Sequence, residues 1–202
     1  MQKQKVGRPR GGDPVQTRRA ILNAAEGCFA ASGFVGATTR QMAALAGVNV
    51  ATLHYHFGSK EELYRAVLDA VTRDDISFPG SGETPERRLS SAVEALWDFG
   101  AAHPARPRLS LLHRLAGPAP AAGALEAPDD RRATLLARML TETGLETPLP
   151  PAETARVILA LLDSALVAAQ DGHGSGAASP WAVADAARAG VVAAALRVAG
   201  VS

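Results

Sequence analysis

The 202-residue sequence predicts an all-α protein in two parts. Apolar residues recur at the three- and four-residue spacing of amphipathic helices along most of the chain, and no segment alternates in the way of a strand. Turns that contain Gly or Pro separate these segments, and several segments open with side chains that cap helices. With 47% hydrophobic and 20% charged residues, the chain has the composition of a globular protein with a sizeable core.

The first predicted helix opens at the sequence DPVQ, with Asp13 as N-cap and Pro14 at the first helical position. It ends at Gly33, since glycine accepts the left-handed backbone that closes many helices. The inward stripe of this helix is predicted to contain Ile21, Ala25, Cys28, Phe29 and Ser32.

Two short helices follow with almost no chain between them. The first begins at TTRQ, where Thr38 caps the helix and Gln41 reaches back, and it ends at Gly47. The second runs from Asn49 to Gly58. Because only Gly-Val-Asn separates the two, the pair is a helix-turn-helix candidate. Its inward residues are predicted to be Met42, Leu45, Val48, Leu53 and Phe57.

A fourth helix opens at SKEE, where Ser59 and Glu62 form another capping box. After it, an acidic loop that contains Gly and Pro separates the N-terminal part from a longer body. We predict a basic arm over 1–12, a helix-turn-helix domain over 13–73 and a helical body over 86–202. The helices of the body are predicted near 86–102, 105–115, 128–143, 151–171 and 181–199.

The charges are unevenly divided along the chain. Residues 1–60 carry a formal charge of +6, and residues 61–202 carry −5. A basic N-terminal part indicates a surface that binds a polyanion, with ordinary surface charge as the alternative. The single cysteine, Cys28, cannot form an internal disulfide, and the apolar segments are too short to span a membrane. With no apolar segment behind its basic N-terminus, the chain is expected to be cytoplasmic.

The stretch NVATLHYHFGSK, residues 49–60, crowds polar and aromatic side chains into the second short helix. A metal site there is disfavoured, because His54 and His56 are two residues apart and so point to different sides of a helix. A nucleophilic site is disfavoured as well, because Ser59 serves as a helix cap and no phosphate-binding or nucleophile motif accompanies it. No metal and no cofactor are expected.

A surface for DNA accounts for more of this stretch. If Leu53 and Phe57 are buried, the other side chains project outward, and small or hydroxylated residues at a helix start fit a major groove. Val50, Ala51 and Thr52 would meet bases, while the later residues of the helix and Lys60 would meet phosphates.

Residues 21–68, ILNAAEGCFAASGFVGATTRQMAALAGVNVATLHYHFGSKEELYRAVL, resemble the DNA-binding domain of TetR-family transcriptional regulators. The specific elements are TTRQMA and AGVN..TLHYHFGSKEEL, and the resemblance covers about a quarter of the chain. It implies an N-terminal three-helix helix-turn-helix DNA-binding domain, with the recognition helix at about 49–57, plus a C-terminal helical ligand-binding and dimerisation domain. It also implies a homodimer that binds an inverted-repeat operator. The positions that commonly face DNA in this family are Thr39, Arg40, Val50, Ala51, Thr52, His54, Tyr55, His56 and Lys60.

The sequence departs from the family pattern inside the recognition helix. The family usually has Ser or Thr where Asn49 stands, a basic or polar residue at Val50, Gly or Pro at Ala51, and Tyr at His54. Asn49 still caps a helix, but Val50 makes base contact there apolar or absent, and His54 makes a phosphate contact weaker or dependent on pH. The arm, with its GRPR motif, either enters a minor groove or adds affinity as a solvated tail.

In the family, the last two helices form the dimer interface, and a ligand pocket lies among the earlier helices of the body. The dimer residues predicted on this basis are Val157, Leu161, Ala165, Ala168, Ala187, Val191, Ala194 and Val198. The pocket residues are predicted to be Trp97, Phe99, His103, Leu112, His113, Leu115 and Met139. For each of these positions, a place in the core of a single chain is the alternative.

The sequence therefore predicts a dimeric repressor, not an enzyme, that leaves its operator when an unknown small-molecule effector binds. One alternative is a helical enzyme or small-molecule carrier with a vestigial helix-turn-helix. Another is an activator of the same family without an effector.

Overall fold

The computed structural model describes residues 13–72, 78, 84–116, 131–171 and 180–201. These residues divide between two compact units that meet between Tyr64 and Arg65. The predicted arm lies outside the described residues, as does most of the predicted loop after the fourth helix. The boundary between the units falls inside a helix, whereas the sequence places the domain boundary at residue 73, which stays a prediction.

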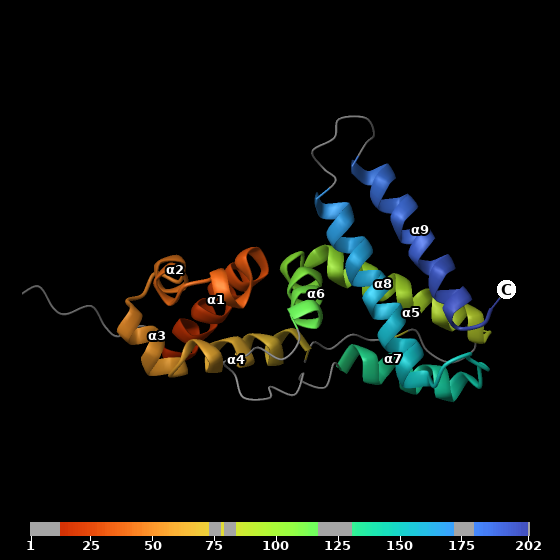
Figure 1. Ribbon diagram of the computed structural model, residues 1–202, viewed down its shortest axis with the longest axis horizontal. Coiled ribbons are helices and arrows are strands. Elements are labelled where there is room, and N and C mark those ends of the chain that lie inside the picture. The colour runs from red at the N-terminus through yellow and green to blue at the C-terminus, as the bar shows by residue number, and fades with distance from the viewer. Residues whose placement is uncertain (1–12, 73–77, 79–83, 117–130, 172–179, 202) are drawn as a thin grey trace, which may run out of the picture. The chain divides into compact units, whose positions relative to one another are not determined.

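Four helices make up the described N-terminal region (Figure 1). They are α1 (Pro14–Gly36), α2 (Thr39–Leu45), α3 (Val50–Phe57) and α4 (Lys60–Thr72). The predicted caps are confirmed. The Asp13 carboxylate accepts from the backbone N–H of Val15, and the Thr38 hydroxyl accepts from that of Gln41. Ser59 and Glu62 exchange the two bonds of a capping box, at 2.8 and 3.1 Å. Because such bonds join residues two or three apart, local sequence determines where these helices begin.

Helix α1 loses its helical geometry at Gly33, where the sequence predicts its end. Gly33 has φ 66°, and a last turn continues to Gly36 beyond it. On the inward side of α1, Ile21, Ala25 and Phe29 are buried. Two predictions about this interior are wrong: Ser32 is exposed, and Leu45 of α2 has 71% of its surface exposed. Helix α2 instead buries Met42 and Ala43, since the small Ala43 lets α1 approach closely.

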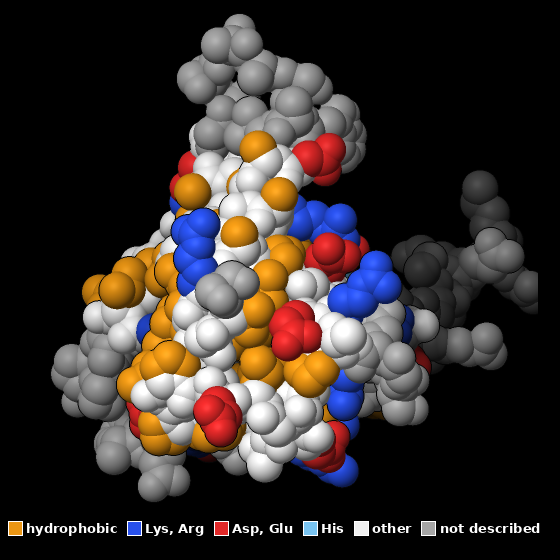
Figure 2. Space-filling model, turned by 90° about the vertical axis from the view of Figure 1, so that its right-hand side faces the viewer, with side chains coloured by type: hydrophobic (Ala, Val, Ile, Leu, Met, Phe, Trp, Pro, Cys, Tyr) orange, Lys and Arg blue, Asp and Glu red, His pale blue; other side chains and the backbone are white. Residues whose placement is uncertain are grey.

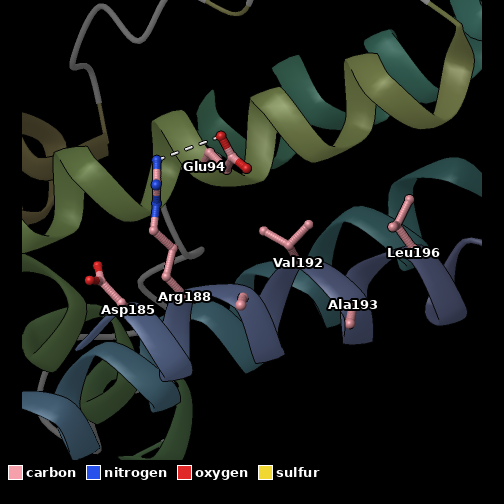
Figure 3. A pocket seen from close by; sticks show the side chains of 7 residues that line it. Glu94, Asp185, Arg188, Val192, Ala193 and Leu196 are labelled. Carbon is pink, nitrogen blue, oxygen red and sulfur yellow. Dashed lines mark ion pairs between the residues drawn. The ribbon is translucent and has the colours of Figure 1, made fainter. Parts of the chain in front are cut away.

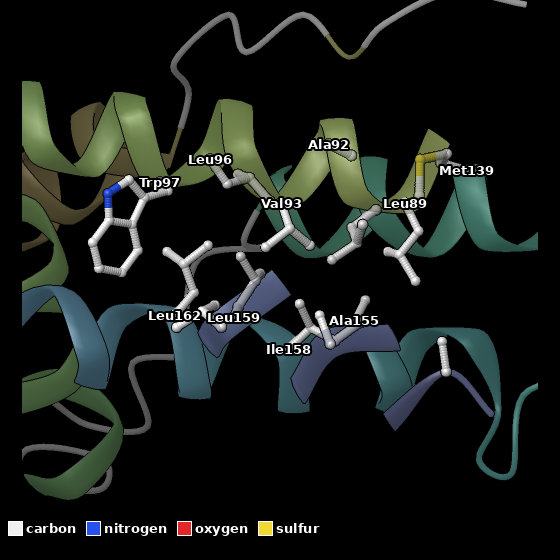
Figure 4. Close-up of a cluster of buried hydrophobic side chains, with 14 of the residues drawn as sticks. Leu89, Ala92, Val93, Leu96, Trp97, Met139, Ala155, Ile158, Leu159 and Leu162 are labelled. Atoms are coloured by element: carbon white, nitrogen blue, oxygen red, sulfur yellow. The ribbon is translucent and has the colours of Figure 1, made fainter. Parts of the chain in front are cut away.

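The second unit contains α5 (Pro85–Ala102), α6 (Ala105–Ala116), α7 (Arg131–Thr143), α8 (Pro151–Asp171) and α9 (Pro180–Val198). Its hydrophobic core lies among α5, α7, α8 and α9, where α5 supplies Leu89, Val93 and Leu96 and α8 supplies Ile158 and Leu162 (Figure 4). Helices α8 and α9 run antiparallel and side by side (Figure 1). The core residues named above for α5 and for α8 lie three or four positions apart within each helix. This spacing confirms the helical periodicity predicted from the sequence.

Helix α5 packs against α8 at Gly100. A Cβ atom at this buried position would collide with the Leu166 side chain. The absence of a side chain at Gly100 therefore leaves room for the Leu166 side chain.

A buried polar network joins α6, α7 and α8. The Asp163 carboxylate, with 0% of its surface exposed, accepts from Arg132 at 3.2 and 3.3 Å and from Arg114 at 2.5 Å. The Ser110 hydroxyl accepts from both guanidinium groups at 3.0 Å. These bonds compensate the charge that Asp163 brings into the interior.

Candidate nucleic-acid interface

The recognition helix predicted at 49–57 corresponds to α3, with Asn49 as its N-cap. Leu53 and Phe57 are buried, at 0% and 6% exposure, and fix the inward side of the helix. Ala51, His54 and Tyr55 are exposed, Tyr55 to 85%. Val50, Thr52 and His56 are half-buried. The helix therefore has smaller side chains in its first turn, at Val50, Ala51 and Thr52. It has larger polar rings toward its end, at His54, Tyr55 and His56.

Thr52 takes part in the cap as well as in the outward surface. The Asn49 side-chain oxygen accepts from the Thr52 backbone N–H at 2.7 Å and from its hydroxyl at 3.0 Å. Since the hydroxyl proton is used in this bond, Thr52 has acceptor lone pairs and a methyl group left for an outside partner. Such a side chain suits a base-edge N–H₂ donor or a thymine methyl.

The tautomer of His54 follows from its hydrogen bond. Its Nδ1 lies against the Gly58 carbonyl oxygen, and a carbonyl can only accept, so Nδ1 carries the proton. In the neutral ring, Nε2 is then an acceptor. A phosphate contact from His54 therefore requires the imidazolium form.

Cations and rings surround the start of α4. Lys60 is half-buried, and its Nζ lies 4.6 Å from the centre of the Phe34 ring. The same ring packs 5.1 Å from Tyr64, and Tyr64 meets Phe29 edge-on at 4.9 Å. These contacts hold the Lys60 ammonium in the first turn of α4, beside the aromatic rings. Nearby along the chain, in the first turn of α2, Thr39 is half-buried and Arg40 is exposed.

The residues predicted to line a ligand pocket are not brought together around the hollow that the structure describes. Trp97 and Met139 are buried in the hydrophobic core, and Leu115 is 75% exposed. Leu112 and His113 are half-buried. Phe99 and His103 stack at 4.5 Å, with the His103 Nδ1–H donating to the Phe99 carbonyl oxygen at 2.9 Å. Local packing therefore accounts for these two rings.

The described hollow, of about 420 Å³, lies between α5 and α9 (Figure 3). Its lining residues are Glu94, Asp185, Arg188, Ala189, Val192, Ala193 and Leu196. Sequence reasoning did not select them, although acids at one end of a row of small residues on α9 were visible in the sequence. Within the described ranges, no group of three His, Cys, Asp or Glu side chains is suited to hold a metal ion.

The residues predicted for a dimer interface divide between the surface and the core. On α8, Val157 and Leu161 are 37% and 40% exposed, Ala168 is exposed and Ala165 is half-buried. On α9, Ala187, Ala194 and Val198 are half-buried, whereas Val191 is 7% exposed and belongs to the core. Packing within its own chain leaves Val191 little surface for a partner. Among residues 185–198 of α9, the exposed positions are instead Asp185, Ala186, Ala189, Gly190, Ala193 and Arg197.

Residues 21–67 match the family model described as bacterial regulatory proteins, tetR family. Over these residues the chain matches the DNA-binding segment of the TetR family. This family segment covers α2 and α3 entirely and most of α1 and α4. It therefore contains every residue that we predicted to face DNA.

Named regulators are similar to part of this chain. The transcriptional repressor NicS of Pseudomonas putida is 33% identical over 93 residues, which are 44% of each chain. The transcriptional regulator RutR of Escherichia coli K12 is 48% identical over 54 residues, which are 27% of this chain and 26% of RutR. The matched segments thus span less than half of either relative.

Solved structures extend the similarity of fold to most of the chain. A TetR-like transcriptional regulator from Rhodococcus sp. RHA1 superposes with a TM-score of 0.63 and 21% identity. The superposition covers 93% of this chain and 99% of that one. At this level of identity, the likeness shows that the body shares the helical fold of such regulators. None of the helices in the described ranges combines the length and hydropathy needed to cross a membrane.

The pKa of the His113 imidazole is lowered from 6.5, first by burial and then by repulsion from Arg114. The unfolded chain therefore binds this proton at a higher pH than the folded chain does. Stability is expected to be highest with the ring neutral and to fall as pH drops below 6.5 toward the lower folded-state pKa. Urea midpoints across this range should fall less steeply for His113→Gln than for the unaltered protein. Parallel pH profiles would contradict this assignment.

Proposed function

We propose that this chain is a transcriptional repressor that binds an inverted-repeat operator in double-stranded DNA as a homodimer. In this proposal it acts in the cytoplasm, and a small-molecule effector that binds the body releases it from DNA. The observation that carries the proposal is the exposed side of α3, held by the buried Leu53 and Phe57 and preceded by a tight turn from α2. That arrangement is what a helix needs to enter a major groove.

The proposed contacts divide into those that read bases and those that position the protein. Val50, Ala51 and Thr52 stand at the start of α3, where apolar surface and an acceptor oxygen meet base edges. Thr39, Arg40, Tyr55, His56 and Lys60 are the proposed phosphate and sugar contacts, together with His54 in its charged form. The match of residues 21–67 to the tetR family model supports DNA binding by this segment.

Gel shifts on the DNA upstream of this protein's own gene test the proposal. We expect a sequence-specific shift that survives an excess of unrelated DNA. Failure to shift any site drawn from that region or from a random pool at low salt would exclude a specific regulator. Candidate metabolites added to the protein–DNA complex then test whether an effector releases the protein from the DNA.

Lys60→Ala is expected to weaken binding to all DNA sequences alike. Loss of one phosphate contact should lower the slope of log affinity against log salt by about one. Lys60→Arg should keep the slope, because it keeps the charge. Thr52→Ala is the contrasting variant, expected to change base preference at one half-site position and leave the salt slope alone. A Lys60→Ala variant whose slope equals that of the unaltered protein would refute the phosphate contact.

The homodimer is proposed to form through the exposed sides of α8 and α9. On α8, Val157, Leu161, Ser164 and Ala168 recur at helical spacing on one exposed side. The small exposed residues of α9 beside them let a second pair of helices approach closely. Exposed apolar side chains that share one side of a helix pair are typical of an association surface.

Leu161→Glu is expected to weaken the dimer at least tenfold, because each copy would bury a charge in an apolar interface. Light scattering after size exclusion, over a range of protein concentrations, measures the dissociation. Leu149→Glu is the matched control, since Leu149 is a similarly exposed leucine, at 44%, that precedes α8. Equal dissociation of the two variants would count against the α8 surface.

A further inference from the structure

Many arginines of the body form ion pairs with carboxylates. Those that pair with described residues are Arg108, Arg114, Arg132, Arg138, Arg156 and Arg188. On the face of the body shown in Figure 2, Lys and Arg side chains likewise lie beside Asp and Glu side chains. Paired charges of opposite sign largely cancel toward a polyanion outside the protein. These arginines therefore contribute little to an attraction for DNA.

Two cations of the N-terminal region lie over aromatic rings instead. The guanidinium carbon of Arg18, on α1, lies 4.7 Å from the centre of the ring of Phe57, the last residue of α3. The Nζ of Lys60 lies over Phe34 in the same way, at 4.6 Å. Within the described ranges, neither Arg18 nor Lys60 forms an ion pair with a carboxylate. Since a ring face attracts a cation without cancelling its charge, both side chains stay positive toward an outside anion.

The ring contact fixes Arg18 beside the end of the recognition helix. Arg18 is exposed, whereas Phe57 is buried, at 6% exposure, and so provides a rigid support. The end of α3 lies about 10 Å along the helix axis from Val50, at about 1.5 Å per residue. Because the major groove is about 12 Å wide, a cation this far from the residues that meet bases reaches the sugar–phosphate backbone at the edge of the groove.

A guanidinium that lies over a ring keeps its edge available for an anion. Its N–H groups lie in the plane of the guanidinium, so the ring covers one face while the donors point sideways. Two parallel N–H donors match two oxygens of a phosphate. Since the ring already restricts the Arg18 side chain, less side-chain freedom is lost when a phosphate binds.

We propose that Arg18 is a phosphate-binding residue of the DNA interface, and that it positions the end of α3 against the DNA backbone. This inference rests on the proposed repressor, and it extends the interface to α1, where the sequence predicted no DNA contact. Arg18 lies outside residues 21–67, so the match to the family model does not assign it. Together with Lys60, it gives the interface two cations that aromatic rings hold in place.

Gel shifts of the full chain on one operator, over a range of salt concentrations, test the charge of Arg18. For Arg18→Ala we expect about threefold weaker binding, and a slope of log affinity against log salt that is lower by about one for each bound chain. Arg18→Lys should keep the slope, because it keeps the charge. Arg18→Met covers the Phe57 ring without a charge, so it should show the same lowered slope as Arg18→Ala. A normal slope in Arg18→Met would show that Arg18 only covers the ring, and would overturn the proposal.

Arg19→Ala is the matched control for the position of the charge. Arg19 is the next residue of α1 and is also exposed, but it points about 100° away around the helix. It lies over none of the described rings. Its removal should lower the slope by less than half as much as Arg18→Ala does. Equal slopes in the two variants would mean that the general charge of α1 attracts the DNA, and would contradict a specific contact from Arg18.

Two further measurements separate the phosphate contact from other roles. Urea midpoints of the Arg18 variants should stay close to that of the unaltered protein, since the substitution is at the surface. Base preference on single-base operator variants should be unchanged in Arg18→Ala, because a phosphate contact carries no sequence information. If the unaltered chain shifts the operator and Arg18→Ala keeps its salt slope, the Arg18 contact is refuted while the repressor stands. If the unaltered chain shifts no site, both proposals fail.

Discussion

Replacing Asp163 with alanine is expected to lower the free energy of unfolding by about 3–5 kcal/mol, because the change leaves the guanidinium of a buried arginine without its counter-ion. Arg132 is 6% exposed and donates twice to Asp163, and Arg114 donates from the other side. Without the carboxylate, the positive charge of Arg132 loses its buried counter-ion. Breaking one partner out of a buried pair costs more than the pair contributes.

Urea denaturation of the full chain, followed by helical circular dichroism, measures this loss. Asp171→Ala is the matched control, since the Asp171–Arg108 pair also joins α8 to α6, at 3.0 Å, but is 54% and 41% exposed. The control should lose no more than about 1 kcal/mol. Asp163→Asn keeps the shape of the side chain and removes its charge, so it should retain most of the loss. Equal losses in Asp163→Ala and Asp171→Ala would show that burial of the network is not what stabilises this part of the fold.

The sequence carried one local sign of this network. Asp163 interrupts the longest apolar run of the chain, and a lone acid in such a run needs a buried partner. Its partners could not be named, because Arg132 lies 31 residues away and Arg114 lies 49 residues away. Periodicity places a residue on a side of its own helix, but the neighbour across the interface depends on how the helices pack.

The starts of the helices were predictable, because the bonds that cap them are local in the sequence. The caps at Asp13, Thr38, Asn49 and Ser59 each act on a backbone N–H within three residues, so they depend on local sequence alone. Leu45 was placed wrongly because α2 has seven residues, fewer than two full helical turns. In so short a helix the larger side chain looks like the inward one, whereas close packing selected Ala43.

The outward side of α3 was predictable as well, because Leu53 and Phe57 determine it by spacing alone. The hollow between α5 and α9 was not. It exists because Ala189 and Ala193 are small where α9 passes α5, and because Arg188 forms an ion pair with Glu94 across the gap. These two residues are 94 positions apart in the sequence, so no local pattern predicts that they meet. Sites of this kind depend on tertiary packing and become visible only in a structure.

Phe29→Ala is expected to abolish DNA binding by unfolding the N-terminal unit. Phe29 has 0% of its surface exposed and packs against Tyr64 at 4.9 Å and Phe34 at 6.1 Å between ring centres. Removing a buried phenyl ring costs about 3–5 kcal/mol. That loss is a large fraction of the roughly 5–15 kcal/mol that stabilises a whole domain, and this unit has a small core.

The variant should therefore show two unfolding transitions in circular dichroism, with the early one absent from the unaltered protein, and no operator shift at any salt concentration. Phe29→Leu keeps most of the buried volume and should lose roughly 1–2 kcal/mol, which leaves DNA binding measurable. Val35→Ala, at a position 90% exposed in the same unit, should stay within about 0.5 kcal/mol of the unaltered protein. An operator shift of normal affinity from Phe29→Ala would mean that the ring cluster does not support α3. Loss of helical signal in one step, for the whole chain at once, would mean instead that the two units fold as one.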